Sequence, residues 1–301
     1  MISTFATVLF AALYAITGAL AREPARVGLV DLMIARTDGL SIPGIAVRTL
    51  SFASTGTEPA VRQKNVKFRR HGDDMVRAVA TAFRATDPET PIEILVATPF
   101  RQDAEGNLAL VIDELELAYA WFAQNGVTLV GETFVAPASS AQRAAIAAAS
   151  GHGLIILASA GNGPAFNAVP PFPAAYPGVI SISTTHLSAE LMREADRDSY
   201  VDFSVAPPLK SNLSYRRDPE AMTMLGSSAA TATALGLAAA LHVAWPVVTR
   251  GDLLELMACA AAADEAVDGG RVWGRGALSV ASIKSHLIQG RGRQSPCGAE
   301  A

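Results

Sequence analysis

Charge, cysteine and nucleotide-binding motifs are all scarce in this sequence, and each scarcity argues against a class of function. Charged residues make up only 17% of the 301 residues and the net charge is -4, so the chain has no electrostatic basis for binding nucleic acid. A short basic cluster within residues 64–70 is interpreted as a solvated loop. The chain has no P-loop and no Gly-x-Gly-x-x-Gly after a strand. No spacing of ligand residues fits a metal site, and we expect neither a metal nor a cofactor.

The length and the apolar content predict one sizeable folded domain. Half of the residues are hydrophobic, and 301 residues fit one large α/β domain or two small ones. The chain has no internal repeat and no linker that would divide it, so residues 22–290 are predicted to form a single domain. The tail at residues 291–301 is predicted to be disordered.

The N-terminal segment has the features of an export signal. Residues 4–21 are uncharged and almost wholly apolar, and they end in Ala19-Leu20-Ala21, which is a pattern for signal cleavage. The first residues lack Lys and Arg, so residues 1–21 are interpreted as a cleaved signal peptide or, alternatively, as a retained membrane anchor. The protein is therefore expected to be secreted or periplasmic, or anchored by residues 4–21. Membrane contact is expected only if the segment is retained.

The two cysteines leave two alternatives open. In an exported protein Cys259 and Cys297 can pair and hold the C-terminal tail. Because Cys259 lies in the apolar stretch 253–263, a buried free thiol is an equally good interpretation.

Apolar strands alternate with helical stretches through most of the chain. This pattern predicts a three-layer α/β fold, with a mostly parallel sheet and helices on both faces. Strands are predicted at residues 26–31, 45–52, 92–98, 127–130, 154–160 and 179–184. Helices are predicted at residues 71–83, 108–125, 139–150, 224–241, 253–263 and 280–288.

The stretch 224–241 is the centre of the predicted fold. It carries no charge and is rich in Ala and Leu, so a helix formed by it has no polar face and must be buried on all sides. Ser228 lies at the N-terminal end, where free backbone N–H groups and the positive end of the helix dipole point outward. Taken alone, a serine here is also explained as a helix cap.

Four polar residues stand at the ends of predicted elements. Asp31 ends the first strand, at the edge where open α/β sheets carry their chemistry, although it can also cap a turn. His71 starts a helix and lies off its apolar stripe. Asn162 follows a buried strand, and Ser228 starts the central helix.

The segments around these residues resemble the signature blocks of the subtilisin-like serine peptidases. The blocks are Asp31, the His71-Gly72 pair, residues 160–162 and residues 226–230, in the family's order. Weaker similarities are found at residues 176–182, 201–207 and 273–278, so the resemblance covers about residues 26–288. It implies a subtilisin-like fold and a serine endopeptidase that acts on a peptide or protein substrate.

The resemblance also implies a role for each residue. Ser228 is the nucleophile, His71 is its general base and then the acid for the leaving amine, and Asp31 orients the imidazole. The Asn162 side chain and the Ser228 backbone N–H bind the oxyanion.

Departures from the family pattern support a second interpretation. Asp31 is followed by Leu32, Ser227 replaces the usual Thr, and Asp73 and Asp74 follow the His-Gly pair. Acidic residues near His71 favour its charged form, which weakens a general base. The alternative function is a catalytically weak or inactive subtilisin fold that serves as a binding or accessory module.

The short distance between Ala21 and the first strand leaves no room for a pro-domain of the kind that many secreted relatives use to fold and to stay inhibited. The chain is expected either to fold unaided or to use a separate inhibitor or folding-assistant chain.

Overall fold

The computed structural model describes residues 22–32, 45–50, 52, 71–102, 108–162, 171–185, 200–205, 226–261 and 274–290. The predicted signal or anchor at residues 1–21, the basic cluster within residues 64–70 and the predicted tail at residues 291–301 lie outside these residues.

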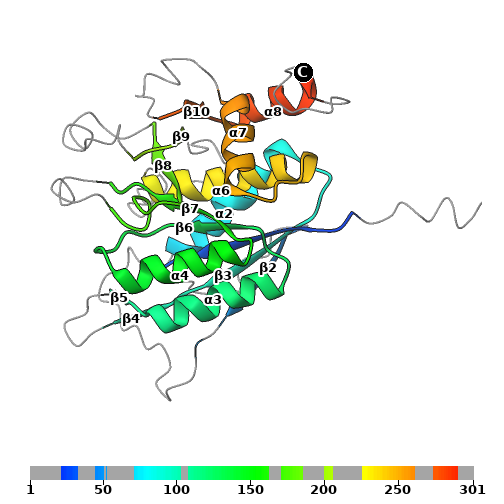
Figure 1. Ribbon diagram of the computed structural model, residues 1–301. Helices are drawn as coiled ribbons and strands as arrows, with labels where there is room; N and C mark the ends of the chain where they lie inside the picture. The colour runs from blue at the N-terminus through cyan, green and yellow to red at the C-terminus, as the bar shows by residue number, and fades with distance from the viewer. Residues whose placement is uncertain are drawn as a thin grey trace, which may run out of the picture.

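Within the described residues, one eight-stranded sheet forms the middle layer (Figure 1). Its strands are β1 (Ala25–Val30), β2 (Ile45–Leu50), β3 (Ile92–Ala97), β6 (Leu129–Glu132), β7 (Ile155–Ser159), β8 (Ile180–Thr184), β9 (Phe203–Val205) and β10 (Ala277–Leu278). Their order across the sheet is β10-β9-β8-β7-β6-β1-β3-β2, and every pair of neighbours is parallel. All carboxyl ends therefore lie along one edge.

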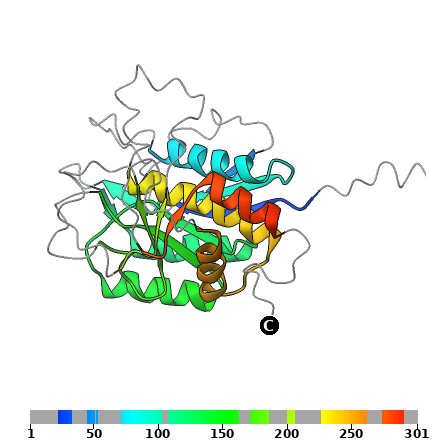
Figure 2. The same cartoon turned by 90° about the horizontal axis from the view of Figure 1, so that it is seen from above.

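Helices cover both faces of the sheet, which confirms the predicted three-layer α/β fold (Figures 1 and 2). One face carries α2 (His71–Thr86), α6 (Ser227–Ala244), α7 (Arg250–Ala260) and α8 (Val280–Gln289), and the other carries α3 (Ile112–Gln124) and α4 (Ser140–Gly151). Side chains of β1 alternate between the layers as a strand requires. Val27 and Leu29 join the α6 side, and Val30 joins the α3 side.

The central helix α6 is enclosed as predicted. Every residue from Ser227 to Leu241 is buried. The Thr231 hydroxyl donates to the Ser227 carbonyl at 2.8 Å, and the Thr233 hydroxyl donates to the Ala229 carbonyl at 2.7 Å. Neither hydroxyl is therefore left without a hydrogen bond in the core. Among the described helices, α6 alone is long and apolar enough to span a membrane, and 78% of it is buried inside the protein.

The predicted helix at residues 108–125 begins too early. Residues Leu108–Leu110 form β5, which pairs antiparallel with β4 (Phe100–Gln102), and α3 begins only at Ile112. The apolar run across this boundary suits a strand as well as a helix, and periodicity alone does not separate the two. The other predicted elements that lie in the described residues differ from the structure mainly at their ends.

The interpretation of Cys259 as a buried free thiol is wrong. Cys259 lies on the exposed side of α7 and is disulfide-bonded. The apolar residues of α7 turn Leu253, Leu256 and Met257 into the core, which leaves Cys259 outside. Cys297, the other cysteine of the chain, lies outside the described residues.

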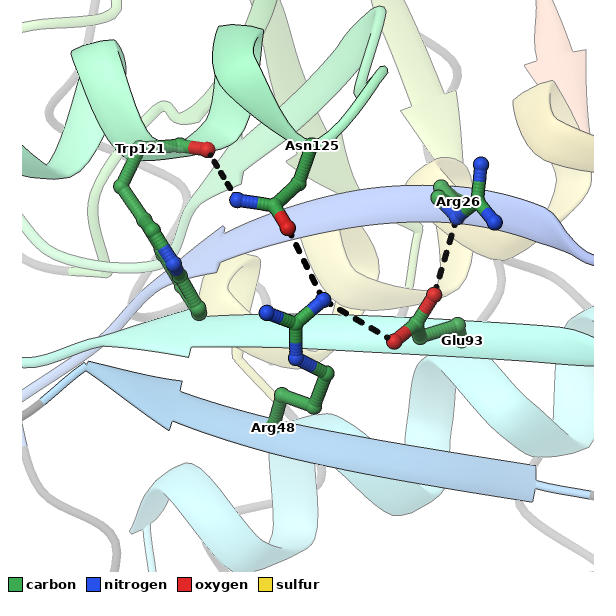
Figure 3. A network of polar contacts seen from close by, with 5 residues as sticks. All are labelled: Arg26, Arg48, Glu93, Trp121 and Asn125. Carbon is green, nitrogen blue, oxygen red and sulfur yellow. Dashed lines mark hydrogen bonds and ion pairs between the residues drawn. The ribbon is translucent and has the colours of Figure 1, made fainter.

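A polar network joins the edge strand β2 to its neighbours (Figure 3). Glu93 on β3 accepts from Arg26 on β1 at 2.9 Å and from Arg48 on β2 at 3.3 Å. Arg48 also donates to Asn125 at the end of α3 at 2.9 Å, and its guanidinium lies over the Trp121 ring. The network is exposed, so we assign it a role in holding β2 in register rather than a large stabilisation.

The close packing of α2 against α6 at Gly236 yields a test. A Cβ at Gly236 would overlap the Val79 carbonyl oxygen and crowd Phe83. We expect Gly236→Ala to lower the free energy of unfolding by about 1–3 kcal/mol, measured by urea denaturation. Gly151, at the end of α4, is the matched control, because a Cβ there meets nothing within 4 Å. Equal effects of Gly236→Ala and Gly151→Ala would contradict the close packing.

Candidate active site

The polar residues singled out in the sequence gather at the carboxyl edge of the sheet. Asp31 directly follows β1, Asn162 follows β7, His71 begins α2, and Ser228 is the second residue of α6. Open parallel sheets bring strand ends and helix starts together at this edge. Residues far apart in the chain thereby become neighbours.

Asp31 and His71 form a buried hydrogen-bonded pair. The His71 Nδ1 atom lies 2.8 Å from Asp31 Oδ1 and 3.0 Å from Oδ2, and the two residues are 8% and 0% exposed. A carboxylate only accepts, so Nδ1 carries the proton and Nε2 is left to act as a base.

The electrostatics of this pair favour a protonated imidazole. Burial lowers the pKa of His71, but the charge of Asp31 and the hydrogen bond to it outweigh burial, and the pKa lies above its usual 6.5. The charge of Asp74 also raises the pKa of His71, as the acidic residues of the first turn led us to expect. His71 therefore becomes neutral only at a higher pH than a free imidazole does.

Thr133 joins the two halves of the site, and the sequence analysis did not identify it. Its hydroxyl donates to Asp31 Oδ2, and its backbone N–H donates to the Val30 carbonyl at 3.2 Å. Its carbonyl accepts from the Ser228 hydroxyl at 2.8 Å. A hydroxyl residue at the end of a buried strand was the available signal. In the sequence, Thr133 follows Glu132 and belongs to no motif that sets it apart.

The Ser228 hydroxyl has one proton, and here that proton is directed to Thr133 rather than to His71. The packing of α2 against α6 nevertheless places Ser228 and His71 at the same height along the two helices. Gly236 lies eight residues after Ser228, and its contact Val79 lies eight residues after His71. Because both helices start at the carboxyl edge and rise about 1.5 Å per residue, their first turns lie side by side.

Asn162 lies against the start of α6. Its Oδ1 accepts from the Ser227 backbone N–H at 2.6 Å, which leaves the Nδ2 group as its donor. A Cβ at Gly226 would stand 2.7 Å from Nδ2, so only glycine leaves room for the amide there. The Ser227 hydroxyl is 2.6 Å from the Ser159 hydroxyl on β7, which fixes the start of the helix to the sheet.

The arrangement offers a base, a hydroxyl and amide donors on one edge. Among the described residues, no group of three or more His, Cys, Asp and Glu side chains could hold a metal ion. The base and the hydroxyl are groups suited to proton transfer and nucleophilic attack.

Solved structures match this fold over nearly the whole chain. Fervidolysin from Fervidobacterium pennivorans, a keratinolytic enzyme related to subtilisin, superimposes with a TM-score of 0.58 at 18% identity, over 86% of this chain and 42% of its own. The epidermin leader peptide processing protease EpiP from Staphylococcus aureus has a TM-score of 0.58 at 14% identity, over 92% of this chain and 77% of its own. The fold is subtilisin-like.

A third match, the nisin leader peptidase NisP from Lactococcus lactis, has a TM-score of 0.53 at 12% identity and covers 86% of each chain. No protein-family model and no curated protein matches the sequence. At these sequence identities the matches show only a similar backbone fold. The roles of Asp31, His71, Asn162 and Ser228 must be argued from their own geometry.

The buried pair can be tested without reference to activity. In the Ser228→Ala protein, NMR titration of the His71 ring is expected to give a pKa above 6.5. Asp31→Asn in the same background removes the charge that raises this pKa while burial remains, so the pKa is expected to fall below 6.5. An unchanged His71 titration in the Asp31→Asn protein would rule out the pairing.

Proposed function

We propose that this protein is an exported serine endopeptidase that hydrolyses peptide bonds in a peptide or protein substrate. The observation that carries the proposal is the buried Asp31–His71 hydrogen bond on a subtilisin-like fold, with Thr133 linking the pair to Ser228. In this proposal Ser228 is the nucleophile, His71 the base and Asp31 the group that orients the imidazole.

The first chemical step needs a small rearrangement of Ser228. As substrate enters, the hydroxyl turns from the Thr133 carbonyl to His71 Nε2, which accepts its proton while Oγ attacks the scissile carbonyl. The Asp31 carboxylate stabilises the imidazolium that forms, and His71 then protonates the leaving amine. Water repeats the sequence on the acyl-enzyme and releases the acid product.

The oxyanion is bound at the start of α6 in this proposal. The Asn162 Nδ2 group and the Ser228 backbone N–H donate to it, and the helix dipole adds to their field. The support is the hydrogen bond that Asn162 Oδ1 accepts from the Ser227 N–H, because it fixes the Asn162 side-chain amide before substrate arrives. Preorganised donors of this kind need no rearrangement as charge develops.

The second candidate is a catalytically weak or inactive subtilisin fold that acts as a binding or accessory module. The specific observation in its favour is that the Ser228 proton is directed to Thr133 and not to His71. The raised pKa of His71 points the same way, because a protonated imidazole cannot act as a base.

Export remains part of the proposal. Its support is the apolar segment at residues 4–21 and the disulfide bond of Cys259, since disulfides persist mainly in oxidising compartments. A separate inhibitor or folding-assistant chain is proposed as a partner, and retention of residues 4–21 would place the enzyme on a membrane.

Labelling with a fluorophosphonate distinguishes the two candidates. This reagent reacts with a serine that has both a working base and a formed oxyanion site. The full-length chain is expected to be labelled at Ser228, located by peptide mapping, and Ser228→Ala is expected to abolish the label. A folded protein that stays unlabelled between pH 6 and 9 would leave only the accessory candidate.

Asn162→Ala tests the oxyanion site separately. It removes one donor to the developing charge, so the labelling rate is expected to fall about 10²–10³-fold. Asn125→Ala is the control, because Asn125 bonds Arg48 in the surface network and touches no candidate catalytic group. Equal rates for Asn162→Ala and the parent would exclude Asn162 from the oxyanion site.

A further inference from the structure

A second carboxylate is buried behind the active-site edge, on the opposite face of the sheet. Glu132 ends β6 and is fully buried. Along β6, Leu129 and Gly131 face the α6 layer, and Val130 faces the α3 layer. By this alternation Glu132 points into the α3 layer, where its Oε1 accepts from the Tyr119 hydroxyl.

Apart from Tyr119, the surroundings of Glu132 provide few groups that would stabilise a negative charge. Its register partners are Val30 on β1 and Ala158 on β7, both apolar. Its Oε2 has no hydrogen-bond partner within the described part of the chain. On α4 the buried polar side chain is Gln142, which is neutral.

Tyr119 is the ionisable group that acts on Glu132, and the other buried acid of α3, Glu114, is paired with Arg101. Burial raises the pKa of Glu132 from 4.5 to about 7, and the Tyr119 hydrogen bond opposes that rise. The pKa of Tyr119 is raised well above its usual 10, so the phenol remains a donor.

One peptide bond connects Glu132 to the residue that links the two halves of the site. Thr133 donates its N–H to Val30, donates its hydroxyl to Asp31 and accepts from Ser228. Glu132 and Thr133 extend to opposite faces of the same strand end. Movement of this strand end therefore changes the positions of both Asp31 and Ser228.

We propose that Glu132 is a positioning residue whose proton keeps the end of β6, and with it Thr133, in place. A neutral Glu132 fits the apolar layer and holds the Tyr119 hydrogen bond. Ionised Glu132 requires more donors than Tyr119 supplies, so the strand end opens to water. The mechanistic consequence rests on the proposed function, whereas the opening itself does not.

The sign of the pH dependence follows from the raised pKa. The folded state holds the proton more tightly than the unfolded chain, so the stabilisation is complete below pH 4.5 and is lost as the pH rises through about 7. In the proposed mechanism, a rise in pH then has two opposing effects. The loss of a proton from His71 supplies a base, whereas the loss of a proton from Glu132 loosens Thr133.

Hydrogen exchange across pH 5.5–8.5 tests the opening directly. After correction for intrinsic exchange, protection of amides in residues 129–135 is expected to fall with a midpoint near pH 7. Glu132→Gln keeps the shape without the charge and is expected to abolish the fall. Tyr119→Phe removes the hydrogen bond that favours ionisation and is expected to move the midpoint up by about one pH unit.

Glu114→Gln is the matched control, since it removes a buried carboxylate from the same layer and is expected to leave the midpoint unchanged. A fall in protection that persists in Glu132→Gln, or a midpoint that does not move in Tyr119→Phe, would overturn the proposal. Fluorophosphonate labelling of the same proteins separates the two proposals. If the opening depends on Glu132 but the fluorophosphonate never labels the protein, the result would support the positioning role of Glu132 and contradict the proposed enzymatic function.

Discussion

The arrangement of the candidate active site depends on one buried carboxylate. Asp31 has no exposed surface, and a carboxylate removed from water is costly unless hydrogen bonds or an opposite charge compensate it. His71 and Thr133, which both come later in the chain, supply that compensation, one from the start of α2 and one from the end of β6. The same bonds order the imidazole and place the carbonyl that accepts the hydrogen bond from the Ser228 hydroxyl.

The sheet separates two buried acids that differ in environment. Asp31, on the α6 side, has a base and a hydroxyl for partners, whereas Glu132, on the α3 side, has one phenol and an apolar layer. The two buried carboxylates are thus compensated by different groups, according to the layer that each one faces. Asp31 directly follows β1 and Glu132 ends the adjacent strand β6, and the Thr133–Val30 and Thr133–Asp31 bonds connect the two strand ends.

The sequence was sufficient to predict the three layers, the enclosed central helix and the positions of Asp31 and His71 at element ends. These features follow from local patterns, namely apolar runs, the absence of charge in residues 224–241 and polar residues at their boundaries. Thr133 was beyond this reasoning, because its significance comes from partners about a hundred residues away in either direction. The state of Cys259 stayed open at the level of sequence, because apolar composition does not reveal which side of α7 it occupies. Likewise, the raised pKa of Glu132 depends on the layer that α3 and α4 build over it.

The strand order has a consequence for how this chain reaches its native state. β1 comes from the N-terminal part of the described chain, yet it lies inside the sheet between β3 and β6. Its hydrogen bonds with β6 cannot form until residue 132 has left the ribosome, and α6 closes over that face only about a hundred residues later. Such long-range parallel pairing makes folding slow and leaves apolar strands open to aggregation in the meantime. Among the described strands, β1 therefore makes the pairing of longest range in sequence, and it is the strand that waits longest for its full set of hydrogen bonds.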